Sequence, residues 1–149
     1  MNAKEQERKE LGILTNEPIK IIIGGRERMM PQPTLAVLDE VSKIAIDLPT
    51  IDTDLTPSKM ISEARALMPK AARKMSKAIG IALAGERFFR LYGKLLAWWY
   101  GLDVYIHATP KELKNAAQAL TVNGGLVDFI LSMQLMSIAR TTRPIESIE

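Results

Sequence analysis

Residues 18–46 read PIKIIIGGRERMMPQPTLAVLDEVSKIAI and decide how the fold begins. The β-branched run near the start predicts a strand over residues 19–23, and the two glycines after it predict a tight turn, because glycine adopts positive φ without steric cost. A second strand over residues 26–30 stops before Pro31 and Pro33, which have no N–H to donate. The stretch therefore predicts a β-hairpin that leads into a helix.

The register of the hairpin depends on the length of its turn. A two-residue turn would place Arg28 opposite Ile21, whereas a three-residue turn over residues 24–26 would place Met29 opposite Ile21. We prefer the longer turn with a bulge, because it gathers four apolar side chains on one face: Ile19, Ile21, Ile23 and Met29.

The middle of the chain predicts three helices and a short extended segment. Thr34 is a good N-cap for the first helix, and a cap followed by proline at residues 56–57 opens the second, which Pro69 should kink or break. A third helix is expected over residues 86–100, with a strong apolar face made by Phe88, Leu91, Tyr92, Leu95, Leu96 and Trp99. Residues 101–108 are expected to be extended, because Val104, Tyr105 and Ile106 favour strands.

The C-terminal part predicts two more helices. Residues 109–112, TPKE, form a capping box with proline in the first turn, and the sequence NGG at residues 123–125 ends that helix. Residues 126–139 are apolar nearly all round, which predicts a helix buried on most sides, either in this core or in an interface. We therefore predict an α+β fold, mostly α, with an N-terminal β-hairpin (19–30) followed by a bundle of about five helices (34–139).

The composition indicates one domain. The chain has 149 residues, enough to bury a real core, and we place the domain at residues 18–139, between a charged flexible arm at 1–17 and a flexible tail at 140–149. The absence of cysteine excludes disulfides and thiolate zinc sites. A net charge of +3 and a pI near 9.2 permit nucleic acid or anionic lipid as a partner without demanding either. Because nothing resembles a secretion signal or a bilayer-spanning run, we expect a cytoplasmic protein.

The sequence does not indicate catalysis. His107 is the only histidine, and we interpret it as a surface or half-buried imidazole, because a catalytic role would need partners that the sequence does not indicate. The glycines at residues 24–25 do not fit a phosphate-binding loop, since a strand and not a helix N-terminus follows them. We expect no enzymatic activity, no metal and no cofactor.

Three features favour binding, each with a plainer alternative. Seven basic residues fall within one predicted helical pair, where they could contact a phosphate backbone or be solvated helix faces: Lys70, Arg73, Lys74, Lys77, Arg87, Arg90 and Lys94. Trp98 and Trp99 could instead bring the chain to a membrane surface or lie in the core. The eight methionines suit either a surface that fits varied polypeptides or ordinary core filling.

Residues 18–48 contain, in this order, a strand, a GG turn, an arginine-containing strand, the motif P-x-P-T-L and the motif L-x-x-V. The residues that carry this order are Gly24, Gly25, Arg26, Pro33, Thr34, Leu35, Leu38 and Val41. This order resembles the N-terminal module of bacteriophage tail assembly chaperones. The T-P-x-E-L helix start at residue 109 and the apolar helix after it are also similar to that family's layout. The resemblance implies a non-enzymatic role, in which the protein coats the long, aggregation-prone tape measure protein before the tail tube polymerises around it in the host cytoplasm.

Our first hypothesis is therefore a phage tail assembly chaperone that binds and solubilises the tape measure protein, or another phage tail protein, and forms a homo-oligomer. Its expected partner contacts are Trp98, Trp99, Leu126, Phe129, Met133 and Met136. The first alternative is a nucleic-acid-binding module that uses the seven basic residues of the helical pair at 70–94. The second alternative is a peripheral membrane protein that uses the two tryptophans.

Overall fold

A computed structural model of the chain describes residues 17–51, 54, 56–123 and 125–141. The described part has an antiparallel hairpin, β1 (Ile19–Ile23) and β2 (Arg26–Met30), followed by five α-helices. These are α2 (Leu35–Ile46), α3 (Pro57–Ala84), α4 (Gly93–His107), α5 (Pro110–Asn123) and α6 (Leu126–Thr141), with the 3₁₀-helix η1 (Gly85–Phe89) between α3 and α4. The predicted hairpin and mostly helical α+β fold are confirmed.

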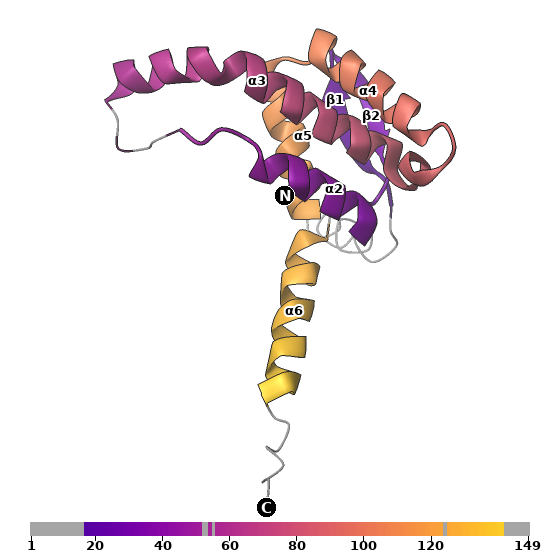
Figure 1. Cartoon of the computed structure of the whole chain (residues 1–149). Coiled ribbons are helices and arrows are strands. Elements are labelled where there is room, and N and C mark those ends of the chain that lie inside the picture. The colour runs from indigo at the N-terminus through magenta and orange to yellow at the C-terminus, as the bar shows by residue number, and fades with distance from the viewer. Residues whose placement is uncertain (1–16, 52–53, 55, 124, 142–149) are drawn as a thin grey trace, which may run out of the picture.

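The helices pack around the hairpin except for the last one. In Figure 1, α3 and α4 lie side by side, with α2 against α3 and with the hairpin and α5 on the other side of this pair. Helix α6 extends away from the body and contacts the end of α5. None of the helices in the described part is long and apolar enough to cross a membrane. The arm and the tail expected at the two ends lie almost wholly outside the described residues.

One face of the hairpin belongs to the core. Its buried residues are Ile19, Ile21, Ile23 and Met30, which pack with Ile79, Leu83, Val104, Ala116 and Leu120 from α3, α4 and α5. A second apolar cluster lies between α2, α3 and α4 and contains Val37, Ile81, Ala84 and Ala97. Burial of these apolar side chains is the main force that holds the layers together.

The register of the hairpin differs from the one we predicted. Ile21 pairs with Arg28, so the turn has two residues, Gly24 and Gly25, whose φ angles of 59° and 72° are those a type I′ turn needs. Met29 is therefore half exposed, and Met30 is the methionine that is buried. The apolar-face argument failed because Arg28 has a partner on that face: its guanidinium lies 2.7 Å from the carboxylate of Asp103 in α4.

Two predictions concerned the long helices. Helix α3 is continuous through Pro69, so of the predicted kink or break the break does not occur; good helix formers surround the proline on an exposed face. The extended segment predicted over 101–108 is wrong, because residues 101–107 complete α4, and the helical path is interrupted earlier, between η1 and Gly93. Packing overrides the β-propensity of this segment, since Gly101 and Val104 are buried against the rest of the domain.

Candidate functional site

Helix α4 buries small residues where it meets α3 and exposes most of its large ones. Gly93, Ala97, Gly101 and Val104 are its buried residues. A Cβ atom at Gly80 of α3 would lie 2.5 Å from the backbone nitrogen of Gly101 and 2.6 Å from the carbonyl oxygen of Ala97. The two helix backbones therefore touch, and only small side chains fit between them. This contact fixes which side of α4 faces the core.

The outer face of α4 is a continuous apolar stripe. Its large side chains are between 37% and 63% exposed and fall within an arc of roughly 120° on the helix: Leu95, Trp98, Trp99, Leu102, Tyr105 and Ile106. Single exposed apolar residues are normal on a protein surface, whereas a contiguous stripe of this kind marks an interaction site. We predicted an apolar face that includes Leu95 and Trp99, but the structure places this face outward.

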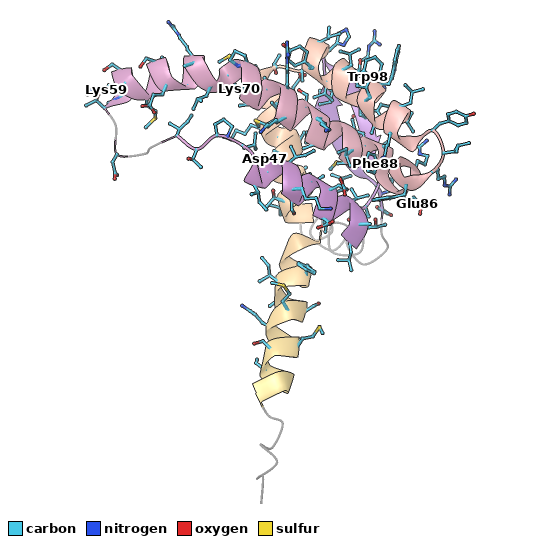
Figure 2. All side chains as sticks on the ribbon, in the orientation of Figure 1. Asp47, Lys59, Lys70, Glu86, Phe88 and Trp98 are labelled. Carbon is cyan, nitrogen blue, oxygen red and sulfur yellow. The ribbon has the colours of Figure 1, made fainter. Side chains whose placement is uncertain are left out.

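A groove lies beside this face, between α2, α3 and α4. Its volume is about 840 Å³. Much of its lining is apolar and comes from all three helices and from η1: Ile44, Ile81, Phe88, Ala97, Trp98, Leu102 and Tyr105. Figure 2 labels Phe88 and Trp98, on η1 and α4, and Asp47, which lines the groove at the end of α2. Because Trp98, Leu102 and Tyr105 belong to both, the outer face of α4 and the groove form one surface.

The one lysine on the α2 wall of the groove is paired within the protein. The Lys43 ammonium lies 2.7 Å from the carboxylate of Asp39 and 2.9 Å from that of Glu40. These two hydrogen bonds raise the pKa of Lys43 above its ordinary value. At the C-terminal end of α2, the Lys74 ammonium donates to the backbone carbonyl of Asp47 at 2.6 Å.

The α3 and α4 walls carry positive charges that are not neutralised. Arg73, Lys77 and Lys94 line the groove, and none of them forms an ion pair within the described part of the chain. Arg73 and Lys77 are like charges one helical turn apart, an arrangement that weakens a helix. Lys94 lies in the first turn of α4, which has no acidic residue there, although the helix dipole disfavours a cation at that end. The groove thus has one strongly cationic side.

Three of the seven basic residues singled out in the sequence line the groove. Lys70, Lys74, Arg87 and Arg90 are not part of the groove lining. Lys74 contacts Asp47, and Arg90 lies 3.8 Å from the carboxylate of Glu86. Figure 2 shows Lys70 on the long helix α3, between Lys59 and the part of α3 that meets α4. The groove therefore uses three of the seven residues, and a basic face that joins all seven stays a prediction.

The predicted partner contacts fall in two separate places. Trp98 and Trp99 lie on the outer face of α4, whereas Phe129, Met133 and Met136 lie on α6, which points away from the body (Figure 1). The side chain of Leu126 lies outside those that the structure describes. The expectation that the last helix is buried in this core is wrong, because the described apolar side chains of α6 are at least 40% exposed. Its alternative, an interface, stays a prediction.

Helix α6 exposes apolar side chains on two sides. Seven of them are between 40% and 75% exposed: Phe129, Ile130, Leu131, Met133, Leu135, Met136 and Ile138. At 100° per residue, positions 129, 133 and 136 form one stripe, and positions 131, 135 and 138 form a second on nearly the opposite side. A flat surface on one side of the helix would cover only one of the two stripes.

The hairpin turn is occupied by a carboxylate of the same chain. The Glu112 side chain accepts hydrogen bonds from the backbone N–H groups of Thr109, Gly24 and Gly25 at 2.9, 3.1 and 3.0 Å. The Thr109 hydroxyl in turn accepts the Glu112 N–H at 3.3 Å, which confirms the predicted capping box. The three N–H donors lower the pKa of Glu112. The glycine turn and the capping box can both be identified in the sequence, but nothing in the sequence shows that they contact each other.

The single histidine is exposed, as expected. The His107 imidazole has a 59% exposed side chain, and its Nδ1 lies 3.1 Å from a carboxylate oxygen of Asp103. The same carboxylate holds Arg28, so this polar group ties the hairpin to the end of α4. Together with the contact to Glu112, it makes the hairpin a support for α4 and α5.

No family model, no curated protein and no solved structure matches the chain. The resemblance to phage tail assembly chaperones therefore remains a prediction that rests on the residues quoted for it. The outer face of α4, the groove and α6 are the features on which a functional proposal can be based.

Proposed function

We propose that this protein is a non-enzymatic phage tail assembly chaperone, which holds apolar segments of the tape measure protein in the host cytoplasm until the tail tube forms around them. The observation that carries the proposal is the outward apolar face of α4. A protein that keeps an aggregation-prone chain soluble must present apolar surface while it remains folded itself, and α4 does so because its opposite side packs on α3 and the core.

Helix α6 supports the same proposal. Its two apolar stripes can contact polypeptide on opposite sides, and Met133 and Met136 are side chains that adapt to varied partners. We further propose that copies of the protein associate through α6, because packing between several copies would cover both stripes at once. Self-association and client binding then use different surfaces, α6 and α4.

The test is coexpression with the tape measure protein, the long coiled-coil-rich tail protein expected to be encoded beside this one. The wild-type protein should keep it in the soluble fraction and be recovered with it. The triple variant Leu95→Gln, Trp99→Gln, Ile106→Gln should lose both effects, since it removes three of the six large side chains of the apolar stripe without touching the buried face of α4. Solubilisation by this variant at the wild-type level would contradict the proposal.

A matched control tests whether the loss is specific to α4. Ile22 and Met29 are 53% and 52% exposed on the outer face of the hairpin. Their replacement by glutamine removes exposed apolar area of a similar kind from a different surface. The control variant should retain client binding, and circular dichroism should show the same helix content in both variants.

A nucleic-acid-binding module is the second candidate, and the cationic side of the groove favours it. It predicts binding of DNA or RNA that weakens steeply with salt, and absence of binding at about 50 mM salt would remove it. The exposed Trp98 and Trp99 favour a peripheral membrane protein in the same limited way. Unchanged tryptophan fluorescence on addition of anionic vesicles would remove that alternative.

A further inference from the structure

We propose that the groove between α2, α3 and α4 takes an amphipathic helix that carries acidic side chains along one border of its apolar face. The inference rests on the proposed function, because it names the class of client segment that the protein would hold. Two properties of the groove lead to it: an apolar lining of suitable size, and a charge that differs between its two sides.

The size of the groove suits a helix. A helix about 10 Å across occupies roughly 420 Å³ per turn, as its pitch and diameter show. The groove volume of about 840 Å³ therefore corresponds to about two turns fully sunk, or to the inner side chains of a longer helix. The lining from Ile44, Ile81 and Trp98 would contact the apolar face of such a guest, as in other helix-in-groove complexes.

The charges set the chemistry and the orientation of the guest. Arg73, Lys77 and Lys94 stand on the α3 and α4 side without ion pairs in the described part of the chain, and Lys94 adds to the positive end of a helix dipole. On the α2 side, Lys43 is already held by Asp39 and Glu40. A guest with glutamates or aspartates along one border would place that border against α3 and α4 and a neutral border against α2.

The same charges argue against nucleic acid as the occupant. Glu40 and Asp47 line the groove on the α2 side, where they would repel a polyanion. Nucleic-acid grooves generally pair a basic track with aromatic surfaces for the bases. This groove contains both aromatic and aliphatic residues, so the acidic residues of its α2 side, and not its apolar lining, argue against a polyanion. A guest helix with one acidic border pairs with the cationic side formed by α3 and α4 and brings no negative charge to the acidic α2 side.

The test uses a pair of fluorescently labelled 18-residue peptides. Both have the same leucine and alanine face, and one carries three glutamates along its border where its twin carries three lysines. Anisotropy titrations against the full chain should show that the glutamate peptide binds about tenfold more tightly, which corresponds to about 1.4 kcal/mol for three surface ion pairs. The preference should shrink at about 0.5 M salt, because exposed charges are screened.

Charge reversal locates the site. The variant Arg73→Glu, Lys77→Glu, Lys94→Glu should reverse the preference between the two peptides. The control variant Lys59→Glu, Lys111→Glu, Lys114→Glu makes the same change in net charge at exposed lysines outside the groove lining, and it should retain the wild-type preference. Equal affinity for the two peptides, or the same result for both variants, would overturn the inference.

Two further outcomes separate this inference from others. A 20-nucleotide single strand that displaces the glutamate peptide, and whose binding the groove substitutions abolish, would assign the groove to nucleic acid and overturn the inference. If the protein still solubilises the tape measure protein while the peptides show no charge preference, the inference fails and the proposed function stands. Charge-dependent peptide binding without capture of the tape measure protein would support the groove assignment and remove the proposed function.

Discussion

The α3–α4 contact makes Gly80→Ala the sharpest test of the fold. A Cβ atom at this position would lie 2.5 Å from the nitrogen of Gly101, 2.6 Å from the oxygen of Ala97 and 2.7 Å from the Cα atom of Gly101. Ordinary contacts between carbon atoms are about 3.5–4.0 Å, so the two helices must separate by roughly 1 Å. All three atoms belong to the backbone of α4 and cannot rotate away.

The magnitude follows from two opposing effects. Overpacking of this kind destabilises a core by about 1–3 kcal/mol, and a clash with backbone belongs at the upper end of that range. Replacement of glycine by alanine inside a helix returns about 1 kcal/mol of helix propensity. We therefore expect Gly80→Ala to lower the free energy of unfolding by about 2 kcal/mol.

Gly101→Ala is the matched control at the same crossing. A Cβ atom there would lie 3.3 Å from the Ser76 oxygen and 3.4 Å from the Lys77 Cα, so a shift of a few tenths of an ångström suffices. The gain in helix propensity is the same, and the net effect should be close to zero. The difference between the two variants isolates the clash from propensity.

Thermal and urea unfolding followed by circular dichroism measure this difference. For a chain of about this length, 1 kcal/mol shifts Tm by roughly 2–4 °C, so Gly80→Ala should melt about 4–8 °C below Gly101→Ala. Melting temperatures within about 1 °C of each other would refute the close packing of α3 on α4, and with it the reason given for the outward apolar face.

Three other features of the structure give predictions of their own: the Glu112 carboxylate, the ion pair of Arg28 with Asp103, and helix α6. Glu112→Gln should lower Tm at pH 7, because an amide cannot accept three backbone N–H groups as a carboxylate does. Since the native pKa of Glu112 is lowered, the carboxylate stabilises the fold above its ordinary pKa of 4.5 and loses this effect as the pH falls through the native value. The Tm difference between the variant and wild type should therefore narrow as the pH falls below 4.5. A double-mutant cycle of Arg28→Met and Asp103→Asn should give a coupling free energy of about 1 kcal/mol in unfolding, because the ion pair is partly buried. A coupling near zero would mean that something other than Asp103 allows Arg28 to lie on the core face of the hairpin. Deletion of residues 126–149 should leave Tm within about 2 °C of the intact chain, because α6 lies apart from the core. If α6 joins the copies, the deletion should also lower the number of copies per particle found by light scattering. A large loss of Tm would place α6 in the core after all.

Local signals in the sequence predicted most of the elements, whereas the faces of those elements depended on contacts that the sequence does not display. The GG turn, the Thr34 cap and the capping box at Thr109 each act within a few residues, and all three form. The predicted hairpin register is wrong because the Arg28 side chain pairs with Asp103, which is 75 residues away in the chain. Nothing near Arg28 indicates that partner, so the apolar pattern alone favoured the other register.

The outward orientation of the apolar stripe of α4 was not predicted, for a related reason. Its large apolar stripe has the spacing that normally predicts a buried face, and its other face contains glycine and alanine. The decisive signal was the pair of glycines, Gly80 and Gly101, because backbones that approach this closely exclude large side chains from between them. A face of small residues on one helix and a glycine on another can thus outweigh a stripe of leucine and tryptophan.

This orientation links the fold to the proposed function. A large apolar side chain gains about 1.5–3 kcal/mol when it moves from water into a packed interface. The folded domain leaves part of that gain unused along the outer face of α4, from Leu95 to Ile106, and holds the helix through its opposite side instead. A partner that covers the stripe obtains the gain without any rearrangement of α3 and α4. The substitutions that test binding, at Leu95, Trp99 and Ile106, and the one that tests the fold, at Gly80, therefore act on opposite sides of the same helix pair and should be separable in experiment.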